Sequence, residues 1–208
     1  MELDTKIETI HKRRHINVDL YDGDVWIGLV TEAARCHVSL TKEQAKGLLN
    51  VCSQHHLRIY ILLALSTGAR NGALLDLTWD RIDLSSRLIE LRTEHMVNKK
   101  GRATVPINNG LYELLKDDER YCEYVVHWGG RKVSSVKKAL KRLATKVGLP
   151  WLSPHVFRHS AAVWMAESGV PMDEIAQFLG HSNVEITRKV YAKYSPDYLR
   201  NAAKALEL

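Results

Sequence analysis

Most of the side chains that could do chemistry lie in one stretch near the C-terminus, residues 153–194. His155 and Arg158 are three residues apart, so they share one face of a helix, close to an N-terminus whose free N–H groups favour an anion. Imidazole, guanidinium and phenol groups recur there among apolar residues at helical spacing: His155, Arg158, His159, His181, Arg188, Tyr191 and Tyr194. This pattern predicts side chains that can bind a phosphate and that lie on packed helices. Helices position such groups better than loops do.

Each of these residues also has an ordinary structural interpretation. A single histidine on a helix is usually a surface or core residue, and a tyrosine on an apolar helix face is usually part of the core. His155 and His159 are four residues apart and could bind a metal ion, but no Glu-rich or Cys partner lies nearby in the sequence. No metal is therefore expected, and the combination of residues carries the functional interpretation.

The combination resembles the C-terminal signature of the tyrosine recombinase, or phage integrase, family. That signature is a His-x-x-Arg pair, then Leu-Gly-His, then a nucleophilic tyrosine a short distance on; the matching residues here are His155 with Arg158, Leu179-Gly180-His181, and Tyr191. A first arginine in a Thr-Gly-x-Arg context is matched by Thr67-Gly68-Ala69-Arg70. The resemblance runs from about residue 40 to the end. It implies an α+β fold, mainly α-helical, with a small antiparallel three-stranded sheet.

The resemblance implies a site-specific recombinase, or integrase, that cleaves and rejoins DNA through a 3′-phosphotyrosyl intermediate. A tyrosine phenolate attacks phosphorus and later leaves, so the energy of the phosphodiester bond is kept in a covalent intermediate. Arg70 and Arg158 would hold the non-bridging oxygens, since a guanidinium is always charged and grips two oxygens in one plane. His181 would donate a further hydrogen bond, and His155 would accept the proton of Tyr191. No metal or other cofactor is implied.

Three points of the implied site stay open. Tyr191 lies ten residues after His181 and Tyr194 lies thirteen after it; Tyr191 fits the family spacing. A lysine on a β-hairpin acts as general acid in the family; Lys99 and Lys100 both qualify, neither at the commonest spacing, and we favour Lys99. The family commonly has Glu where this chain has Ala73. Another carboxylate must then orient Arg70, or Arg70 is held less firmly. In the structural interpretation, Arg70 forms an ion pair with Asp76 or Asp80.

The elements that must position these residues are mostly helices. Thr41 and Gln44 form a capping box for a first helix, at whose end His55 and His56 are expected to be exposed. The run from Leu57 is apolar nearly all round, which is typical of a buried helix. Strands are predicted at 87–92 and 103–107, and further helices around 111–115, 135–147, 154–168, 173–179, 184–191 and 197–207. The predicted N-caps are Asn108 or Asn109, Ser134 or Ser135, Ser153, Asp173 and Asn183.

Charge favours a polyanionic partner. The net charge is +6, and residues 131–147 hold seven basic residues and no acidic one. A basic amphipathic helix can lie along a phosphate backbone or form a solvated surface. We expect DNA contact through these basic residues, and in particular through Lys132, Lys137, Lys138, Lys141 and Arg142.

The remaining expectations concern organisation and location. The chain divides into an N-terminal segment, residues 1–38, and a catalytic domain, residues 39–208; with so short an N-terminal segment it is either a fragment or an unusually short family member. The chain has three scattered cysteines, no apolar run of membrane-spanning length and no signal peptide. We therefore expect a cytoplasmic protein, bacterial or phage-encoded, that acts on the nucleoid. The expected partner is double-stranded DNA, with a monomer in isolation, a homotetramer on paired sites and accessory DNA-bending proteins.

The alternative functions are those of a type IB topoisomerase, an inactive DNA-binding module and a metal-dependent nuclease.

Overall fold

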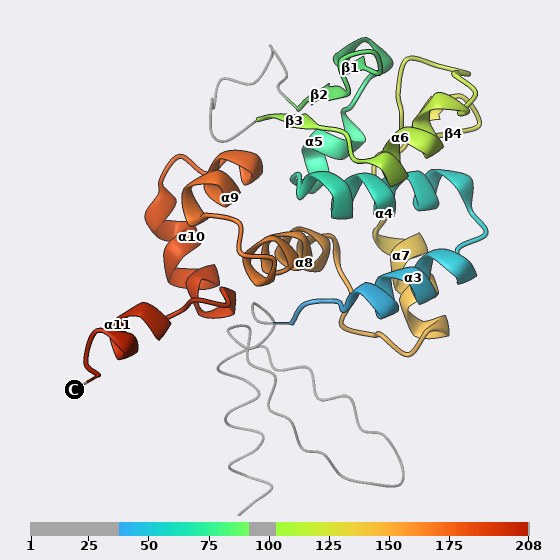
Figure 1. Cartoon of the computed structure of the whole chain (residues 1–208). Helices are drawn as coiled ribbons and strands as arrows, with labels where there is room; N and C mark the ends of the chain where they lie inside the picture. The colour runs from blue at the N-terminus through green and yellow to red at the C-terminus, as the bar shows by residue number, and fades with distance from the viewer. Residues whose placement is uncertain (1–37, 92–102, 208) are drawn as a thin grey trace, which may run out of the picture. The chain divides into compact units, whose positions relative to one another are not determined.

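The computed structural model describes residues 38–91 and 103–207, which form a mainly helical fold with a small sheet at one edge (Figure 1). Its helices are α3 (Lys42–Val51), α4 (His55–Thr67), α5 (Asn71–Leu75), α6 (Asn109–Lys116), α7 (Lys137–Lys146), α8 (Pro154–Glu167), α9 (Met172–Leu179), α10 (Val184–Tyr191) and α11 (Arg200–Lys204). The strands are β1 (Ile82–Asp83), β2 (Leu88–Glu90), β3 (Thr104–Pro106), β4 (His127–Trp128) and β5 (Arg131–Lys132). Two 3-10 turns are η1 (Trp79–Arg81) and η2 (Ala192–Tyr194). The predicted fold class is confirmed.

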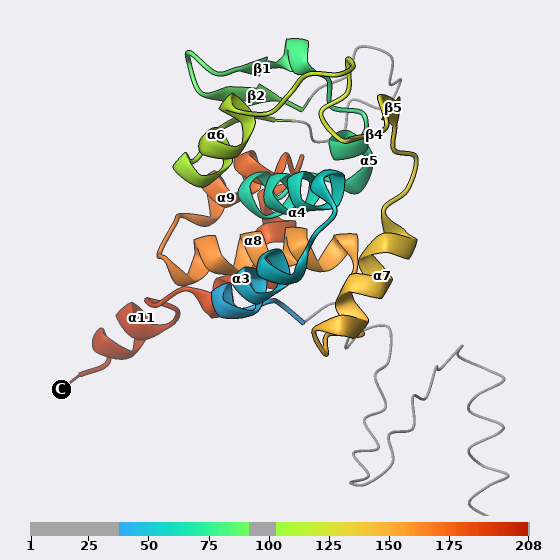
Figure 2. The ribbon, with the colours of Figure 1, turned by 90° about the vertical axis from the view of Figure 1, so that its right-hand side faces the viewer.

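Helix α4 lies at the centre of this arrangement. Its residues are apolar on nearly every side, and the structure covers them with α8 on one side and with α6 and the sheet on another (Figures 1 and 2). Tyr60 and Phe157 are fully buried where α4 meets α8, with their rings edge to face and 6.4 Å apart. The Tyr60 hydroxyl donates a hydrogen bond of 2.7 Å to Asn71, which ties α4 to α5. Because α4 is packed against α5, α6 and α8, its C-terminal end is fixed.

The predicted hairpin forms two strands of the three-stranded sheet. The order is β1-β2-β3, all antiparallel, with Ile82 opposite Ile89 and Ile89 opposite Val105. Ile89 and Val105 are fully buried, so the alternating apolar residues of both strands point toward the core. A second sheet, β4 with β5, was not predicted. Its strands have two residues each, which is too short for an alternating pattern.

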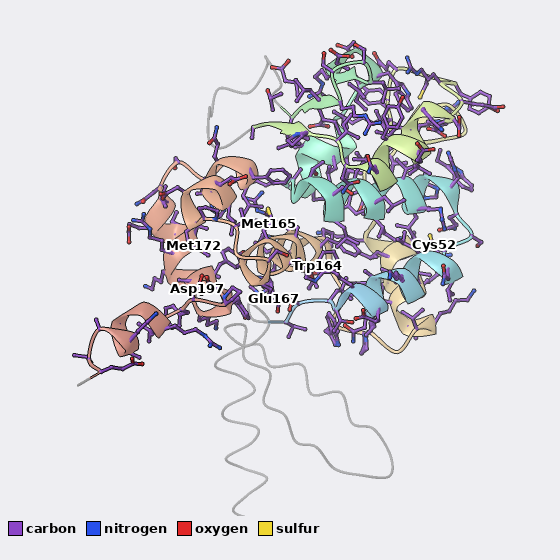
Figure 3. All side chains as sticks on the ribbon, viewed as in Figure 1. Cys52, Trp164, Met165, Glu167, Met172 and Asp197 are labelled. Atoms are coloured by element: carbon purple, nitrogen blue, oxygen red, sulfur yellow. The ribbon has the colours of Figure 1, made fainter. Side chains whose placement is uncertain are left out.

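Helix α8 joins two groups of core residues. Its first turns pack Val156 and Phe157 into the large core around α4, and its later turns pack Ala162 and Val163 against α9 and α10. Figure 3 labels side chains of both kinds on this helix: the Trp164 indole N–H donates to the Leu40 carbonyl oxygen at 2.8 Å, whereas Met165 packs in the second group. Helix α8, which carries Arg158, is therefore packed against core residues along its length.

Several predicted helix ends are confirmed and others are wrong. The Thr41 capping box and the caps at Asn108 and Asn183 are present. His55 and His56 do not end the first helix; they begin α4, and His56 is buried with Trp128 edge-on to its ring at 4.8 Å. That contact joins residues far apart in the sequence, so local pattern could not reveal it.

Among the remaining N-cap predictions, those at Asp173 and at Ser134 or Ser135 are wrong. Helix α9 begins after Pro171, which leaves Asp173 inside the first turn. Ser153 is the N-cap of α8, as predicted, but its side chain makes no capping hydrogen bond; the Val156 N–H donates to the Ser153 backbone carbonyl oxygen at 3.0 Å. Val136, not Ser134 or Ser135, is the N-cap of α7, although the Ser135 hydroxyl accepts from the Lys137 N–H at 3.3 Å.

Some sequence predictions lie outside the described residues. These are the N-terminal segment, of which residues 1–37 are not described, and both hairpin lysines, Lys99 and Lys100. Within the described parts of the chain, no helix combines the length and the apolar character needed to cross a lipid bilayer.

We predict that Gly68→Ala destabilises the protein more than Gly169→Ala. Both glycines have positive φ, 57° and 78°, so alanine costs about 1–2 kcal/mol of backbone strain at either position. At Gly68 the new Cβ would also lie 2.6 Å from Leu179 Cδ2, whereas at Gly169 it would meet nothing within 4 Å. Because Leu179 is buried, this clash adds on the order of 1–3 kcal/mol. Urea unfolding of the two variants measures the difference, and equal losses would contradict the packing at Gly68.

Candidate active site

The first arginine of the site follows a turn that Thr67 and Gly68 build. The buried Thr67 hydroxyl donates to the Leu63 carbonyl oxygen at 2.7 Å and accepts from the Ala69 N–H at 3.2 Å. Gly68 has left-handed φ and ends α4, because its N–H closes back onto Ala64. The chain then turns sharply and delivers Arg70, exposed, to the N-cap position of α5. The Thr-Gly-x-Arg pattern thus has a structural reason at each position.

Arg158 is buried and joins the two ends of the site. Its Nη1 donates to the Gly68 carbonyl oxygen at 2.7 Å and its Nη2 donates to the Leu179 carbonyl oxygen at 3.0 Å. These two carbonyl groups lie at the C-terminal ends of α4 and α9, where helix dipoles favour a cation. One side chain on α8 therefore fixes the turn before Arg70 and the turn before His181.

His181 is placed by the end of α9. Gly180 takes left-handed φ of 66°, and the His181 N–H donates to the Ala176 carbonyl oxygen at 2.8 Å, which closes the helix end. The His181 Nδ1 and the fully buried Thr187 hydroxyl are hydrogen-bonded at 2.8 Å, so α10 holds the ring orientation. Sequence analysis did not identify Thr187, because a threonine on a helix carries no signal of this role.

The charges of the site act on one another. Burial, then repulsion from Arg158 and Arg70, lowers the pKa of His181 to about 4, so the ring is neutral at neutral pH. Burial, then repulsion from Arg70, lowers the pKa of Arg158 to about 10, with Tyr191 acting in the opposite direction; the guanidinium stays charged. The site therefore combines two cations with a neutral hydrogen-bonding imidazole, which suits a group that brings negative charge.

A small cavity marks the meeting point of these elements. Its volume is about 10 Å³, and it is lined by Ala69, Arg70, Ala73, Leu91, Ala103, Arg158 and Leu179. Ala73 is buried and offers no carboxylate where the family commonly has Glu. Asp76, considered above as a partner for Arg70, makes an ion pair with Lys132 at 2.6 Å.

Tyr191 lies in the same region at the end of α10. Its side chain is buried, and its hydroxyl is hydrogen-bonded to Nδ1 of His159 at 3.3 Å. The rings of the two residues lie 5.3 Å apart, and the Tyr194 ring approaches His159 edge-on at 6.4 Å. The structure thus brings Arg70, Arg158, His181 and Tyr191 into one region and adds His159 to them.

Other residues of the sequence prediction have different surroundings. His155 is exposed on the first turn of α8. Arg188 makes ion pairs with Glu185 at 2.9 Å and with Asp173 at 3.0 Å, so it ties α10 to α9. The basic residues of α7, which are Lys137, Lys138, Lys141 and Arg142, are exposed opposite its buried face. Lys132 lies on β5, where its ammonium group is bound to Asp76 and lies over the Tyr124 ring.

Comparison with known protein families gives one match over most of the chain. The model described as the phage integrase family matches residues 38–197. The chain is 28% identical over 210 residues to a tyrosine recombinase XerC-like protein of Caldanaerobacter subterraneus subsp. tengcongensis, covering 81% of this chain and 53% of that protein. It is 31% identical over 182 residues to tyrosine recombinase XerA of Thermococcus kodakarensis, covering 82% and 63%. The chain thus spans only about half to two thirds of these relatives.

Solved structures show the same fold. The catalytic domain of bacteriophage HP1 integrase superposes with a TM-score of 0.60 at 22% identity, covering 82% of this chain and 96% of that one. The Tn1549 transposon integrase, in complex with transposon right end DNA, superposes with a TM-score of 0.67 at 20% identity, covering 90% and 69%. At this identity the likeness concerns the fold alone.

Proposed function

Because the chain belongs to the phage integrase family, we propose that it carries the catalytic domain of a site-specific DNA recombinase. The domain would span residues 39–208, which the family match over 38–197 supports. The proposed reaction cleaves and rejoins DNA through a 3′-phosphotyrosyl intermediate. The observation that carries this proposal is the buried Tyr191 phenol close enough to interact with Arg158, which lines a small cavity together with Arg70.

The roles follow from the charges. Arg70 and Arg158 would bind the non-bridging oxygens of the phosphate, where negative charge builds up in the transition state. Arg158 already donates to two carbonyl groups, so its position is set before DNA arrives. His181, neutral because its pKa is about 4, would donate one hydrogen bond to the same phosphate. Tyr191 would be the nucleophile, and these fixed groups remove the need for a metal ion.

The general acid would be Lys99 or Lys100. Support comes from the described residues on either side of these lysines: Leu91 and Ala103 both line the cavity with Arg70 and Arg158. The Leu91 N–H donates to the Ala103 carbonyl oxygen at 3.2 Å, so the two residues that flank the segment with the lysines lie side by side at the cavity. A lysine there would protonate the departing 5′ oxygen, a step that typically contributes about 100- to 10,000-fold.

The proposed partner is double-stranded DNA carrying recombination sites. The DNA complex of the Tn1549 integrase supports this partner. The exposed basic face of α7 would lie along the phosphate backbone. Lys132 would contribute less, since its charge is already balanced by Asp76.

Assembly and location complete the proposal. We expect a monomer in isolation and a homotetramer on paired sites, with accessory DNA-bending proteins at some sites. The tail exposes Tyr198, Leu199 and Leu206, which suits docking on a second protomer. The protein would act in the bacterial cytoplasm, as expected of a protein related to phage integrases.

Removing two positive charges at the start of α7 should weaken DNA binding and make the affinity depend less on salt concentration. In a variant with Lys137→Gln and Lys138→Gln, the negative slope of log affinity against log salt concentration should become less steep, by about 0.9 for each lost phosphate contact. The matched control is Lys116→Gln on α6, whose ammonium group is paired with Glu113. Fluorescence anisotropy over a range of salt concentrations measures both slopes. An equal change in the two variants would mean that α7 does not face DNA.

Tyr191→Phe should abolish covalent attachment to DNA while leaving the fold and DNA binding intact. The assay incubates the protein in EDTA with nicked duplexes carrying candidate sites and detects an SDS-resistant adduct. Tyr194→Phe is the matched control, because Tyr194 lies near the same histidine but its hydroxyl would not react. Loss of the adduct in Tyr194→Phe instead, or an adduct that forms only with added metal, would refute the proposed mechanism.

A further inference from the structure

The structure brings to the Tyr191 hydroxyl a histidine that the family signature did not assign. The inference drawn from it rests on the proposed function and concerns the same site. His159 follows Arg158 on α8, four residues after His155, and its Nδ1 is hydrogen-bonded to the Tyr191 hydroxyl at 3.3 Å. Hydrogen bonds at unliganded sites are often long and shorten when the substrate binds. The atom that would attack phosphorus is thus already in contact with a group able to accept its proton.

This contact follows from how α10 ends. Helix α10 stops at Tyr191, the chain continues into η2, and both elements pack against α8. The imidazole plane is tilted by 39° to the Tyr191 ring and by 80° to the Tyr194 ring, so His159 lies against both tyrosines. The Tyr191 hydroxyl is hydrogen-bonded to His159.

Burial makes a nearby proton acceptor necessary. Tyr191 is only 7% exposed, so bulk water has little access to its side chain. A phenol is a poor nucleophile until it loses its proton, and a positioned base can take that proton during attack. The acceptor must therefore be a group of the protein close to the hydroxyl.

The other histidines of the site suit this role less well. His181 has its Nδ1 bonded to Thr187 and faces Arg158 and Arg70, whose charges together with burial make its ring hard to protonate. His155 is exposed to solvent one turn away from His159 on the same helix. Arg158 lies close enough to interact with Tyr191, but a guanidinium has no acceptor site.

We propose that His159 orients the Tyr191 hydroxyl and accepts its proton through Nδ1 when the phenol attacks DNA. In that step the phenol O–H bond breaks, a bond forms between the phenol oxygen and phosphorus, and the bond from phosphorus to the 5′ oxygen breaks. The phenol proton moves to Nδ1 of His159, and the 5′ oxygen takes its own proton from the general acid. Rejoining runs in reverse, so His159 returns the proton to Tyr191. The neutral ring carries its proton on Nε2 before attack.

The test compares His159→Gln with His155→Gln, each with either tyrosine or a ring-fluorinated tyrosine at position 191. Fluorination makes the phenol more acidic, so the reaction depends less on a base. With tyrosine, His159→Gln should slow adduct formation by about 100-fold or more, and fluorination should restore most of the rate. His155→Gln should slow adduct formation less, and fluorination should not restore its rate.

Two outcomes of this comparison overturn the role of His159. One is the reverse pattern, in which fluorination rescues His155→Gln and not His159→Gln. The other is a slow His159→Gln variant that fluorination does not rescue although it folds and binds DNA normally, since His159 would then only support packing. If the wild-type protein forms no adduct, the proposed function fails, and the role of His159 fails with it.

A second measurement needs no DNA. In ¹⁵N-histidine spectra of the free protein, the Nδ1 resonance of His159 should change in Tyr191→Phe and stay unchanged in Tyr194→Phe. An unchanged resonance in Tyr191→Phe would show that the hydrogen bond is absent and would overturn the proposal independently of any cleavage activity. A changed resonance together with a failed cleavage assay would show that the hydrogen bond exists and that the proposed function is wrong.

Discussion

The arrangement of the candidate site depends on one buried guanidinium bound to two backbone carbonyl groups. Arg158 is 8% exposed and donates to Gly68 at the end of α4 and to Leu179 at the end of α9. Hydrogen bonds to a charged group typically contribute about 1.5–3 kcal/mol each, and losing the guanidinium group would leave both carbonyl groups without this donor. The first arginine follows one of these turns and the second histidine follows the other. A single side chain therefore sets the distance between two signature motifs that are far apart in the sequence.

The same guanidinium creates an electrostatic condition that a phosphate would relieve. Among the charged groups that act on Arg158, Arg70 repels it, and both arginines depress the pKa of His181. Ala73, where the family commonly has Glu, adds no negative charge to the cavity. A phosphodiester bound beside Arg70 and Arg158 would be attracted by both cations at once. The neutral His181, held by Thr187, would then act as a donor that carries no charge of its own.

The sequence allowed the fold class, the central apolar helix and the hairpin strands to be predicted, because each depends on local pattern or on a family motif. The structure brings Arg70, Arg158, His181 and Tyr191 into one region, and their catalytic roles stay predictions. What it did not reveal depends on contacts between distant segments. His56 begins a helix and is buried because Trp128 packs against it. His159 is 32 residues from Tyr191, and nothing in the sequence indicates that α8 and α10 place them together. Lys132 belonged to a basic run in the sequence, but the structure pairs it with Asp76 from another element.

The most direct test of this account is hydrogen exchange of individual amides in Arg158→Lys. Lysine keeps the charge, but its single compact ammonium group cannot reproduce the planar fork that reaches both carbonyl groups. The account predicts faster exchange at the Gly68 N–H, bonded to Ala64, and at the His181 N–H, bonded to Ala176, with no change at the Leu140 N–H that opens α7. Unchanged exchange at Gly68 and His181, or a change at only one of them, would contradict the claim that Arg158 holds the two turns together.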